Sequence, residues 1–301
     1  MFAEDETKAY TRVQCDSSVI HKRIIQEGAW GSKATENATV KIVINDVTCT
    51  GVPLQSLQES TTISQILDPS FNGSFKVGDV DSVIDKSLET CVQSMLVGET
   101  SSFNIKLPSI SNLKQEECSV FPYVIQCSIK LEDLTNDTPI YMWTIEKIHD
   151  LALKHKTEGV KLFNSGRKIE SFLRFSKSFK ILNIIKVTSE KNKDSEDFLS
   201  LRIALLNNMA NCQLEFQNYI HAITLCSKVL ILDPNNIKSL YRRSVAYMNI
   251  KKLDEAKDDL QKILQIEPCN AIAKEKYSDL KVIMKEKDAN YAAVIKKMFS
   301  S

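Results

Sequence analysis

Two cations four residues apart form the pair in this sequence that most clearly suggests chemistry. Lys238 and Arg242 lie in the stretch "NNIKSLYRRSVAY", which otherwise has the pattern of a helix. On a helix, residues four apart lie one above the other on the same face. A lysine and an arginine held side by side bind carboxylates through charge-assisted hydrogen bonds. The pair therefore predicts a site for an acidic ligand, and the alternative is an ordinary solvated helix face.

An internal repeat indicates the elements that would position this pair. "NYIHAITLCSKVLILDPNN" aligns with "KLDEAKDDLQKILQIEPCN", so that Ala222 matches Ala256 and Pro234 matches Pro268, each 34 residues apart. This is the period of the tetratricopeptide repeat, which has two antiparallel helices, small residues where they cross, and proline after the second helix. Lys238 and Arg242 then belong to the first helix of the last repeat.

A looser repeat lies upstream, in "KTEGVKLFNSGRKIESFLRFSKSFKIL". Its spacing to the next repeat is 51 residues, and we expect the polar stretch "SEKNKDSEDF" (189–198) to contain the extra ones. Three repeats are the usual minimum for a stable stack, and a last amphipathic helix at about 271–298 would cover the exposed end. The sequence therefore predicts an all-α repeat domain over residues 147–300.

The first helices of stacked repeats line a concave groove, and four polar side chains are expected in it. These are Lys156 from the first repeat, Asn208 from the second, and Lys238 and Arg242 from the third. Charge-assisted hydrogen bonds to a terminal carboxylate and an acidic side chain are each worth about 1.5–3 kcal/mol before ordering costs. A few of them, with apolar contacts, reach the roughly −8 kcal/mol of a micromolar peptide complex.

These four residues resemble the dicarboxylate clamp of tetratricopeptide co-chaperones, which hold the C-terminal Met-Glu-Glu-Val-Asp of heat-shock protein 90. The resemblance implies that Lys156 and Lys238 bind terminal carboxylates, and that Asn208 binds the terminal main-chain carboxylate. It implies that Arg242 binds a carboxylate or a backbone carbonyl further along. Val160 stands where the family often has asparagine, which implies a weaker grip. Heat-shock protein 70 or another acidic tail stays open as the partner.

The first half of the chain has the pattern of a half-buried antiparallel sheet. Apolar and polar residues alternate at 38–45, 101–107 and 123–131, as in strands with one face buried. Between them, "VIDKSLETCVQSMLVGE" (83–99) has helical spacing and is expected to end at a glycine cap, Gly98. A sheet wrapped on one short helix predicts an α+β domain.

Three segments resemble the large immunophilins, in which an FKBP-type peptidyl-prolyl isomerase domain precedes tetratricopeptide repeats. "VIHKRIIQEGAWG" resembles the first strand of that domain, and the 83–99 segment resembles its helix. "PIYMWTIEKIHDLALKHKTEG" (139–159) resembles the joint between the two domains. The resemblance implies an N-terminal tail at 1–15, an FKBP-like half-barrel at 16–137 and a joint at 138–146.

The FKBP-like half departs from its family at the pocket that binds proline. FKBP catalysis needs no acid or base, because an apolar aromatic pocket favours the twisted peptide bond and lowers a barrier of roughly 18–20 kcal/mol. No counterpart of the family's Phe–Asp pair or tyrosine flap is evident in "QESTTISQILDPS" or "SISNLKQEECSVFP". The resemblance places six residues at the degenerate pocket: Ile44, Phe75, Val83, Ile84, Leu88 and Cys127. Of these, Ile44, Leu88 and Cys127 stand where the family has aromatic residues. We therefore expect a non-catalytic domain, and the alternative is an active isomerase whose pocket uses different residues.

Composition narrows the remaining classes of function. Residues 1–140 carry 11 basic and 19 acidic side chains, whereas residues 141–301 carry 28 and 19, so the second half suits an anionic partner. We find no nucleic-acid motif, no C-x-x-C pair among eight cysteines, no metal-ligand spacing, no signal peptide and no apolar run long enough to span a membrane. These observations predict a cytoplasmic adaptor without cofactor or metal, whose client the sequence does not name.

Overall fold

The structure is a computed structural model, and it describes residues 11–13, 18–50, 64–107, 123–188 and 196–299. The chain divides into two compact units, Met1–Ile140 and Tyr141–Ser301, and each is described by itself below. Among the described residues, none of the helices combines the length and the hydropathy that a membrane crossing requires.

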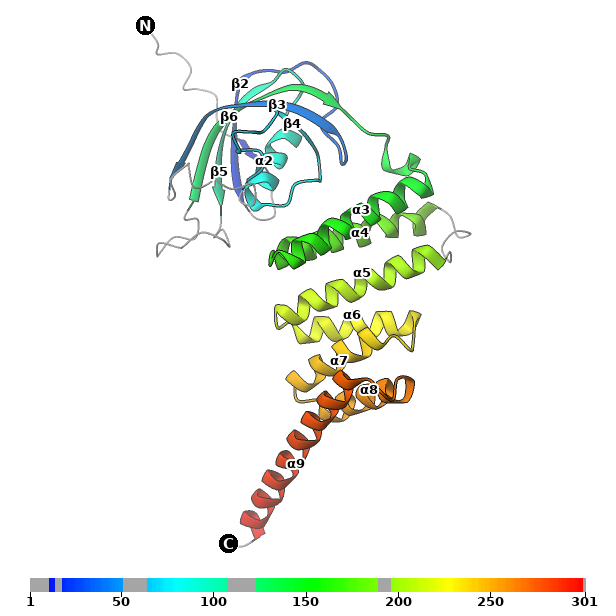
Figure 1. The fold of residues 1–301 in the computed structure, drawn as a ribbon. Coiled ribbons are helices and arrows are strands. Elements are labelled where there is room, and N and C mark those ends of the chain that lie inside the picture. The colour runs from blue at the N-terminus through cyan, green and yellow to red at the C-terminus, as the bar shows by residue number, and fades with distance from the viewer. Residues whose placement is uncertain (1–10, 14–17, 51–63, 108–122, 189–195, 300–301) are drawn as a thin grey trace. The chain divides into compact units, whose positions relative to one another are not determined.

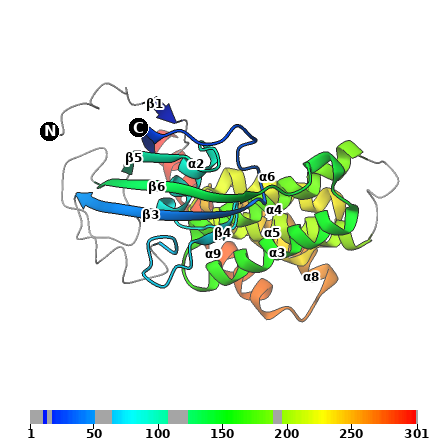
Figure 2. The same ribbon diagram turned by 90° about the horizontal axis from the view of Figure 1, so that it is seen from above.

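The first unit contains a six-stranded antiparallel sheet that curves over one helix (Figures 1 and 2). Its alternating burial follows the alternating sequence pattern, since successive side chains on a strand point to opposite faces. The strand order is β1-β2-β5-β6-β3-β4. The strands are β1 (Thr11–Val13), β2 (Val19–Gln26), β3 (Thr39–Thr50), β4 (Ser74–Lys76), β5 (Thr100–Leu107) and β6 (Tyr123–Thr135).

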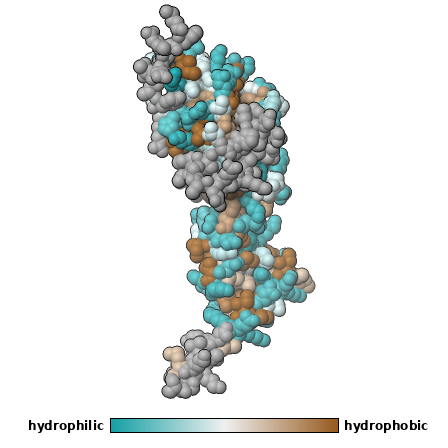
Figure 3. Space-filling model, turned by 90° about the vertical axis from the view of Figure 1, so that its left-hand side faces the viewer, coloured by the Kyte–Doolittle hydropathy of each residue, from teal (hydrophilic) through white to brown (hydrophobic). Residues whose placement is uncertain are grey.

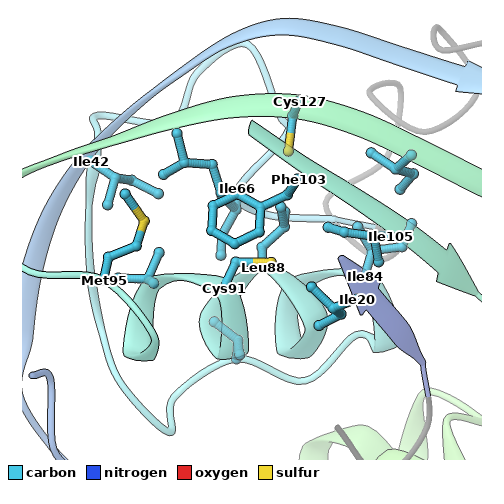
Figure 4. Close-up of a cluster of buried hydrophobic side chains, with 14 of the residues drawn as sticks. Ile20, Ile42, Ile66, Ile84, Leu88, Cys91, Met95, Phe103, Ile105 and Cys127 are labelled. Atoms are coloured by element: carbon cyan, nitrogen blue, oxygen red, sulfur yellow. The ribbon is translucent and has the colours of Figure 1, made fainter. Parts of the chain in front are cut away.

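The helix in the described part of this unit is α2 (Val83–Gln93), and it packs against the concave side of the sheet. Ser82 caps its first turn, because the Ser82 side chain accepts a hydrogen bond from the Asp85 backbone N–H. Figure 4 shows Leu88 on the helix facing Phe103 of β5 and Cys127 of β6. All three side chains are buried, so the core of the unit lies between helix and sheet.

The helix ends earlier than the sequence indicates. The predicted cap was Gly98, whereas α2 ends at Gln93 with Ser94 as its C-cap. The Ser94 hydroxyl donates to the Cys91 carbonyl at 2.6 Å and so competes with another helical turn. Gly98 instead has φ of +80° in the turn that leads into β5, where a residue without Cβ is favoured. The short edge strands β1 and β4 were also not predicted, and β1 lies within the expected tail.

The second unit is a stack of helix pairs followed by one long helix (Figure 1). A 3₁₀ turn, η1 (Ile140–Met142), precedes it. The helices are α3 (Ile145–Asn164), α4 (Lys168–Thr188), α5 (Glu196–Glu215), α6 (Tyr219–Leu232), α7 (Ile237–Asn249), α8 (Leu253–Ile266) and α9 (Ala271–Phe299). This architecture confirms the predicted all-α repeat fold. Its division into three repeats and a closing helix, with the predicted bounds, stays a prediction. Most of the stretch expected to hold the extra residues, 189–195, lies outside the described residues.

The turns inside the three helix pairs show the repeat directly. Gly166, Gln217 and Lys251 all have positive φ, at +83°, +59° and +62°. They are 51 and 34 residues apart, which are the two spacings of the sequence repeat. Pro234 and Pro268 each lie two residues beyond the second helix of a pair, as the repeat pattern requires.

Small residues let the two helices of each pair approach closely. Ser171, Ala222 and Ala256 occupy equivalent positions on α4, α6 and α8, and all three are fully buried. In the first pair, the Ser171 hydroxyl also donates to the backbone carbonyl of Gly159 at 2.7 Å. The surface drawn in Figure 3 is a mixture of hydrophilic residues and hydrophobic patches, whereas the buried side chains of neighbouring helices pack together in clusters. The cores therefore lie between helices, where the sequence repeat places them.

Candidate functional site

Helices α5 and α7, with Tyr219 at the start of α6, line an open cavity of about 420 Å³, and the cationic pair is part of this lining. Lys238 and Arg242 both line it, so the structure brings together the two residues singled out by their spacing. The cavity combines cations, amides and aromatic rings. Its lining is Asn211, Leu214, Glu215, Tyr219, Lys238, Tyr241, Arg242, Val245 and Asn249.

The first turn of α7 is fixed by a side-chain cap, and this sets where the two cations point. The Asn236 side-chain oxygen accepts the backbone N–H of Ser239 at 3.1 Å, so the helix begins at Ile237. Leu240 and Ser244 face the buried side of α7. The other side of the helix carries the cations into the cavity.

The Arg242 guanidinium is held by two side-chain amides of α5. Its NH1 group donates to the Asn207 oxygen at 3.0 Å, and its Nε group donates to the Asn211 oxygen at 3.4 Å. Among the described residues, no carboxylate pairs with Arg242. Burial lowers the pKa of this guanidinium, although an arginine side chain still carries its charge at neutral pH. The site therefore contains a partly buried positive charge whose contacts are neutral.

Arg243, the next residue, is in the opposite situation. Its Nε and NH2 groups form a two-point ion pair with Asp259 of α8, at 2.8 and 2.7 Å. Its NH1 group donates to the Ser227 hydroxyl at 3.1 Å. The hydrogen bonds to Asp259 raise the pKa of Arg243. Arg243 therefore ties α7 to α8 and is not available to a ligand, whereas Arg242 is.

The structure leaves the other two predicted clamp residues outside the cavity lining. Asn208 lies on α5, three residues before Asn211, and its side chain is partly buried. Lys156 lies on α3, which contacts α5, and it is also partly buried. In the described part of the chain, neither side chain has a hydrogen-bond or ion-pair partner. Their role in the clamp stays a prediction.

Sequence reasoning missed the amides that hold Arg242. Asn207 is buried and Asn211 lines the cavity, yet neither was a candidate. A usable signal was present, because asparagines at 207, 208 and 211 are unusual inside a helix. Residues 207 and 211 are also four apart, so they share a face of α5.

The first unit has a second cavity, of about 340 Å³, between β3 and residues 66–73. Of the six residues predicted for the proline pocket, Ile44 lines it. Phe71, which was not a candidate, also lines it and packs beside Phe75 with ring centroids 6.4 Å apart. The lining is Ile42, Val43, Ile44, Val47, Ile66, Leu67, Asp68, Phe71 and Gly73.

The other predicted pocket residues belong to the core rather than to this cavity. Ile84, Leu88 and Cys127 are at most 3% exposed, and Figure 4 shows all three among the buried side chains. Burial raises the pKa of the Cys127 thiol to about 12, so it is a neutral packing group. Phe75 and Val83 are partly buried against the same core.

The stretch "QESTTISQILDPS", in which no counterpart of the family's Phe–Asp pair was evident, contains a Leu–Asp pair. Leu67 and Asp68 both line the cavity beside Ile44. Asp68 accepts hydrogen bonds from the backbone N–H and the hydroxyl of Ser70, and these bonds lower its pKa. The cavity is thus mainly aliphatic, with one carboxylate. Among the described residues, no three His, Cys, Asp or Glu side chains are grouped to hold a metal ion.

Comparison with known proteins finds similarities to both halves of the chain. The family described as "BDBT FKBP like N-terminal" matches residues 14–136. FK506-binding protein 59 of Drosophila melanogaster is 28% identical over 225 residues, which cover 74% of this chain and 50% of that protein. Peptidyl-prolyl cis-trans isomerase FKBP4 of Bos taurus is 30% identical over 66% of this chain and 44% of that protein. The chain thus spans half or less of the length of these two relatives.

One solved structure that is similar to part of this chain is the first TPR of Spaghetti (RPAP3) bound to the HSP90 peptide SRMEEVD. It is 23% identical, with a TM-score of 0.38, and the match covers 46% of this chain and 95% of that one. Residues 14–136 match that FKBP-like family. The chain as a whole is similar to immunophilins, including FK506-binding protein 59 and FKBP4.

Proposed function

We propose that the groove lined by α5 and α7 binds the acidic C-terminal peptide of heat-shock protein 90, and that the protein works as a co-chaperone adaptor. One observation carries this proposal. Arg242 is a partly buried guanidinium whose partners among the described residues are the neutral amides Asn207 and Asn211. A buried charge without a counter-charge is costly, and an incoming carboxylate removes that cost.

The neighbours of Arg242 favour a peptide terminus over an isolated carboxylate. Lys238 adds a second cation on the same face of α7, so two carboxylates can be bound close together. Tyr241 and Val245 continue the lining with apolar surface, which suits a side chain upstream of the acidic end. Asn208 on α5 and Lys156 on α3 would extend the grip toward the first repeat.

The FKBP-like unit, in this proposal, serves as a binding module and not as an isomerase. Its cavity is walled mainly by aliphatic side chains, and Phe71 is the aromatic residue among the lining residues. A proline pocket uses aromatic rings for buried area and rigid shape. The relatives include a protein named as a peptidyl-prolyl isomerase, so catalysis has to be tested directly.

The test is calorimetric titration of the full chain with the peptide SRMEEVD. We expect wild-type protein to bind with Kd of about micromolar, and Lys238→Ala to weaken binding by about tenfold or more, because one charge-assisted bond is lost. Lys228→Ala is the matched control, since Lys228 is exposed on α6 and removes the same charge away from the cavity. Equal losses in the two variants, or no binding by wild type, would contradict the proposed groove.

A further inference from the structure

We propose that Asn207 and Asn211 are positioning residues that aim Arg242 and keep its charge available for the ligand. This inference rests on the proposed function of the groove. It adds two residues that do not belong to the clamp predicted from the sequence. It also explains why both residues are asparagines. A side-chain amide holds a guanidinium in place without neutralising its charge.

Asn207 is the centre of a buried hydrogen-bond network that joins α5 to the start of α7. Its side-chain oxygen accepts from Arg242 NH1 at 3.0 Å and from the Ser239 hydroxyl at 2.9 Å. Its amide nitrogen donates to the Asn236 side-chain oxygen at 3.3 Å, and Asn236 is the N-cap of α7. The residue that aims Arg242 is therefore fixed to the end of the helix that carries Arg242.

Two contacts on different nitrogens fix the plane of the guanidinium as well as its place. Asn207 holds NH1, and Asn211 holds Nε from one turn further along α5. Rotation about the Cζ–Nε bond would break the NH1 contact. The N–H groups of Arg242 that do not bind the two amides are therefore held in a fixed direction. Holding a binding group in its bound geometry lowers the ordering cost of association.

The choice of amides over carboxylates matters as much as the geometry. Asp259 shows what a carboxylate does here, because it binds Arg243 through two nitrogens and uses up that charge. An aspartate at 207 would keep the oxygen acceptor for Arg242 and Ser239. It would also supply the counter-charge that we expect the ligand to bring. Aspartate at 207 would also lose the donation from the amide nitrogen to Asn236. The cleaner contrast is at Asn211, whose oxygen accepts from Arg242 and whose amide nitrogen has no partner among the described residues.

The first experiment uses this contrast in the full chain, with SRMEEVD as the probe. We expect Asn207→Ala and Asn211→Ala to weaken binding. Asn211→Asp keeps the acceptor for Arg242 and adds a counter-charge, so it should weaken binding more than Asn211→Ala does, by about tenfold relative to wild type. In an Arg242→Ala background, Asn207→Ala should change affinity by less than about twofold, because interactions in one network are not additive. Binding by Asn211→Asp at wild-type strength, or additive losses, would overturn the proposal.

The second experiment needs no ligand, so it separates this inference from the proposed function. NMR of the arginine side chains reports rotation about Cζ–Nε, and we expect slow rotation for Arg242 in wild type and fast rotation in Asn207→Ala. Asn211→Ala is the control, because it removes only the contact to Nε, which lies on the rotation axis, and should leave the rotation slow. Fast rotation of Arg242 in the wild type would refute the positioning role. Slow rotation without peptide binding would refute only the proposed ligand.

Discussion

Arg242 and Arg243 are adjacent in the sequence but have different roles, because different side chains face their guanidinium groups. Arg242 meets two amides and Arg243 meets a carboxylate, although both lie on the second turn of α7. The spacing to Lys238 was enough to select Arg242 from the sequence, because i and i+4 fix a shared helix face. Asn207 and Asn211 could not be selected in that way. Their role depends on how α5 crosses α7, which a single helical pattern does not contain.

Arg243→Ala should destabilise the repeat unit without removing the peptide site. The Arg243 and Asp259 side chains are 23% and 6% exposed, so the change leaves a buried carboxylate without its partner. We expect a loss of about 2–3 kcal/mol in the free energy of unfolding, measured by urea denaturation. Peptide affinity of the folded protein should stay within about twofold of wild type. A large drop in affinity with unchanged stability would show that Arg243 contacts the ligand.

The repeated helices were predictable because the same sequence pattern occurs in two successive repeats. Ala222 and Ala256, with Pro234 and Pro268, fix the period and the ends of the helices. The end of α2 was not predictable to the same degree. Both Ser94 and Gly98 are credible stops, and the choice depends on a hydrogen bond from Ser94 to Cys91. Short edge strands such as β1 and β4 have too few residues to show alternation.

Gly159→Ala should loosen the first helix pair. A Cβ at Gly159 would lie 2.6 Å from Cε1 of Phe175, a fully buried ring on α4. Overpacking of this kind costs about 1–3 kcal/mol, and the better helix propensity of alanine offsets about 1 kcal/mol of it. The net result should be a lower melting temperature. Gly31→Ala is the control, because a Cβ at Gly31 meets nothing within 4 Å. Equal melting temperatures for the two variants would contradict this packing.

Asp85 on α2 should make the FKBP-like unit less stable as pH rises. Burial raises its pKa above the ordinary 3.8, although bonds from Ser64, Gln65 and Ile66 act in the other direction. A raised pKa means that the folded state holds the proton more tightly, so this stabilisation is present at low pH and is lost as pH passes the raised value. Relative to Asp85→Asn, wild type should lose stability above about pH 4 in urea denaturation. Parallel pH profiles would contradict the raised pKa.

At the scale of the whole molecule, each unit presents a different kind of surface. The repeat unit offers cations that have no acidic partner among the described residues, and the FKBP-like unit offers a mainly aliphatic cavity. The loss of aromatic walls stays a prediction of the sequence resemblance, which places Leu88 and Cys127 where FKBP-type domains have aromatic residues. That these side chains complete the core, and that Phe71 lines the remaining cavity, depends on how the sheet closes over α2.

The full chain should not accelerate cis–trans exchange of a Xaa-Pro peptide. Leu88 and Cys127 are buried in the core, and the mainly aliphatic cavity gives a proline ring little rigid aromatic surface. A protease-free NMR exchange assay measures this without confusing isomerisation with peptide capture. We also expect no tight binding of macrolides such as rapamycin. Acceleration that a macrolide inhibits would show that the first unit is an isomerase, and the clamp would be unaffected.

The most direct test of the central claim compares one peptide with and without its terminal charge. The full chain is titrated by calorimetry with SRMEEVD as the free acid and as the C-terminal amide. The groove of Lys238 and Arg242 predicts a Kd of about micromolar for the acid, binding at least about tenfold weaker for the amide, and weaker binding of the acid at high salt. Equal affinity for the acid and the amide, unchanged by salt, would contradict the account.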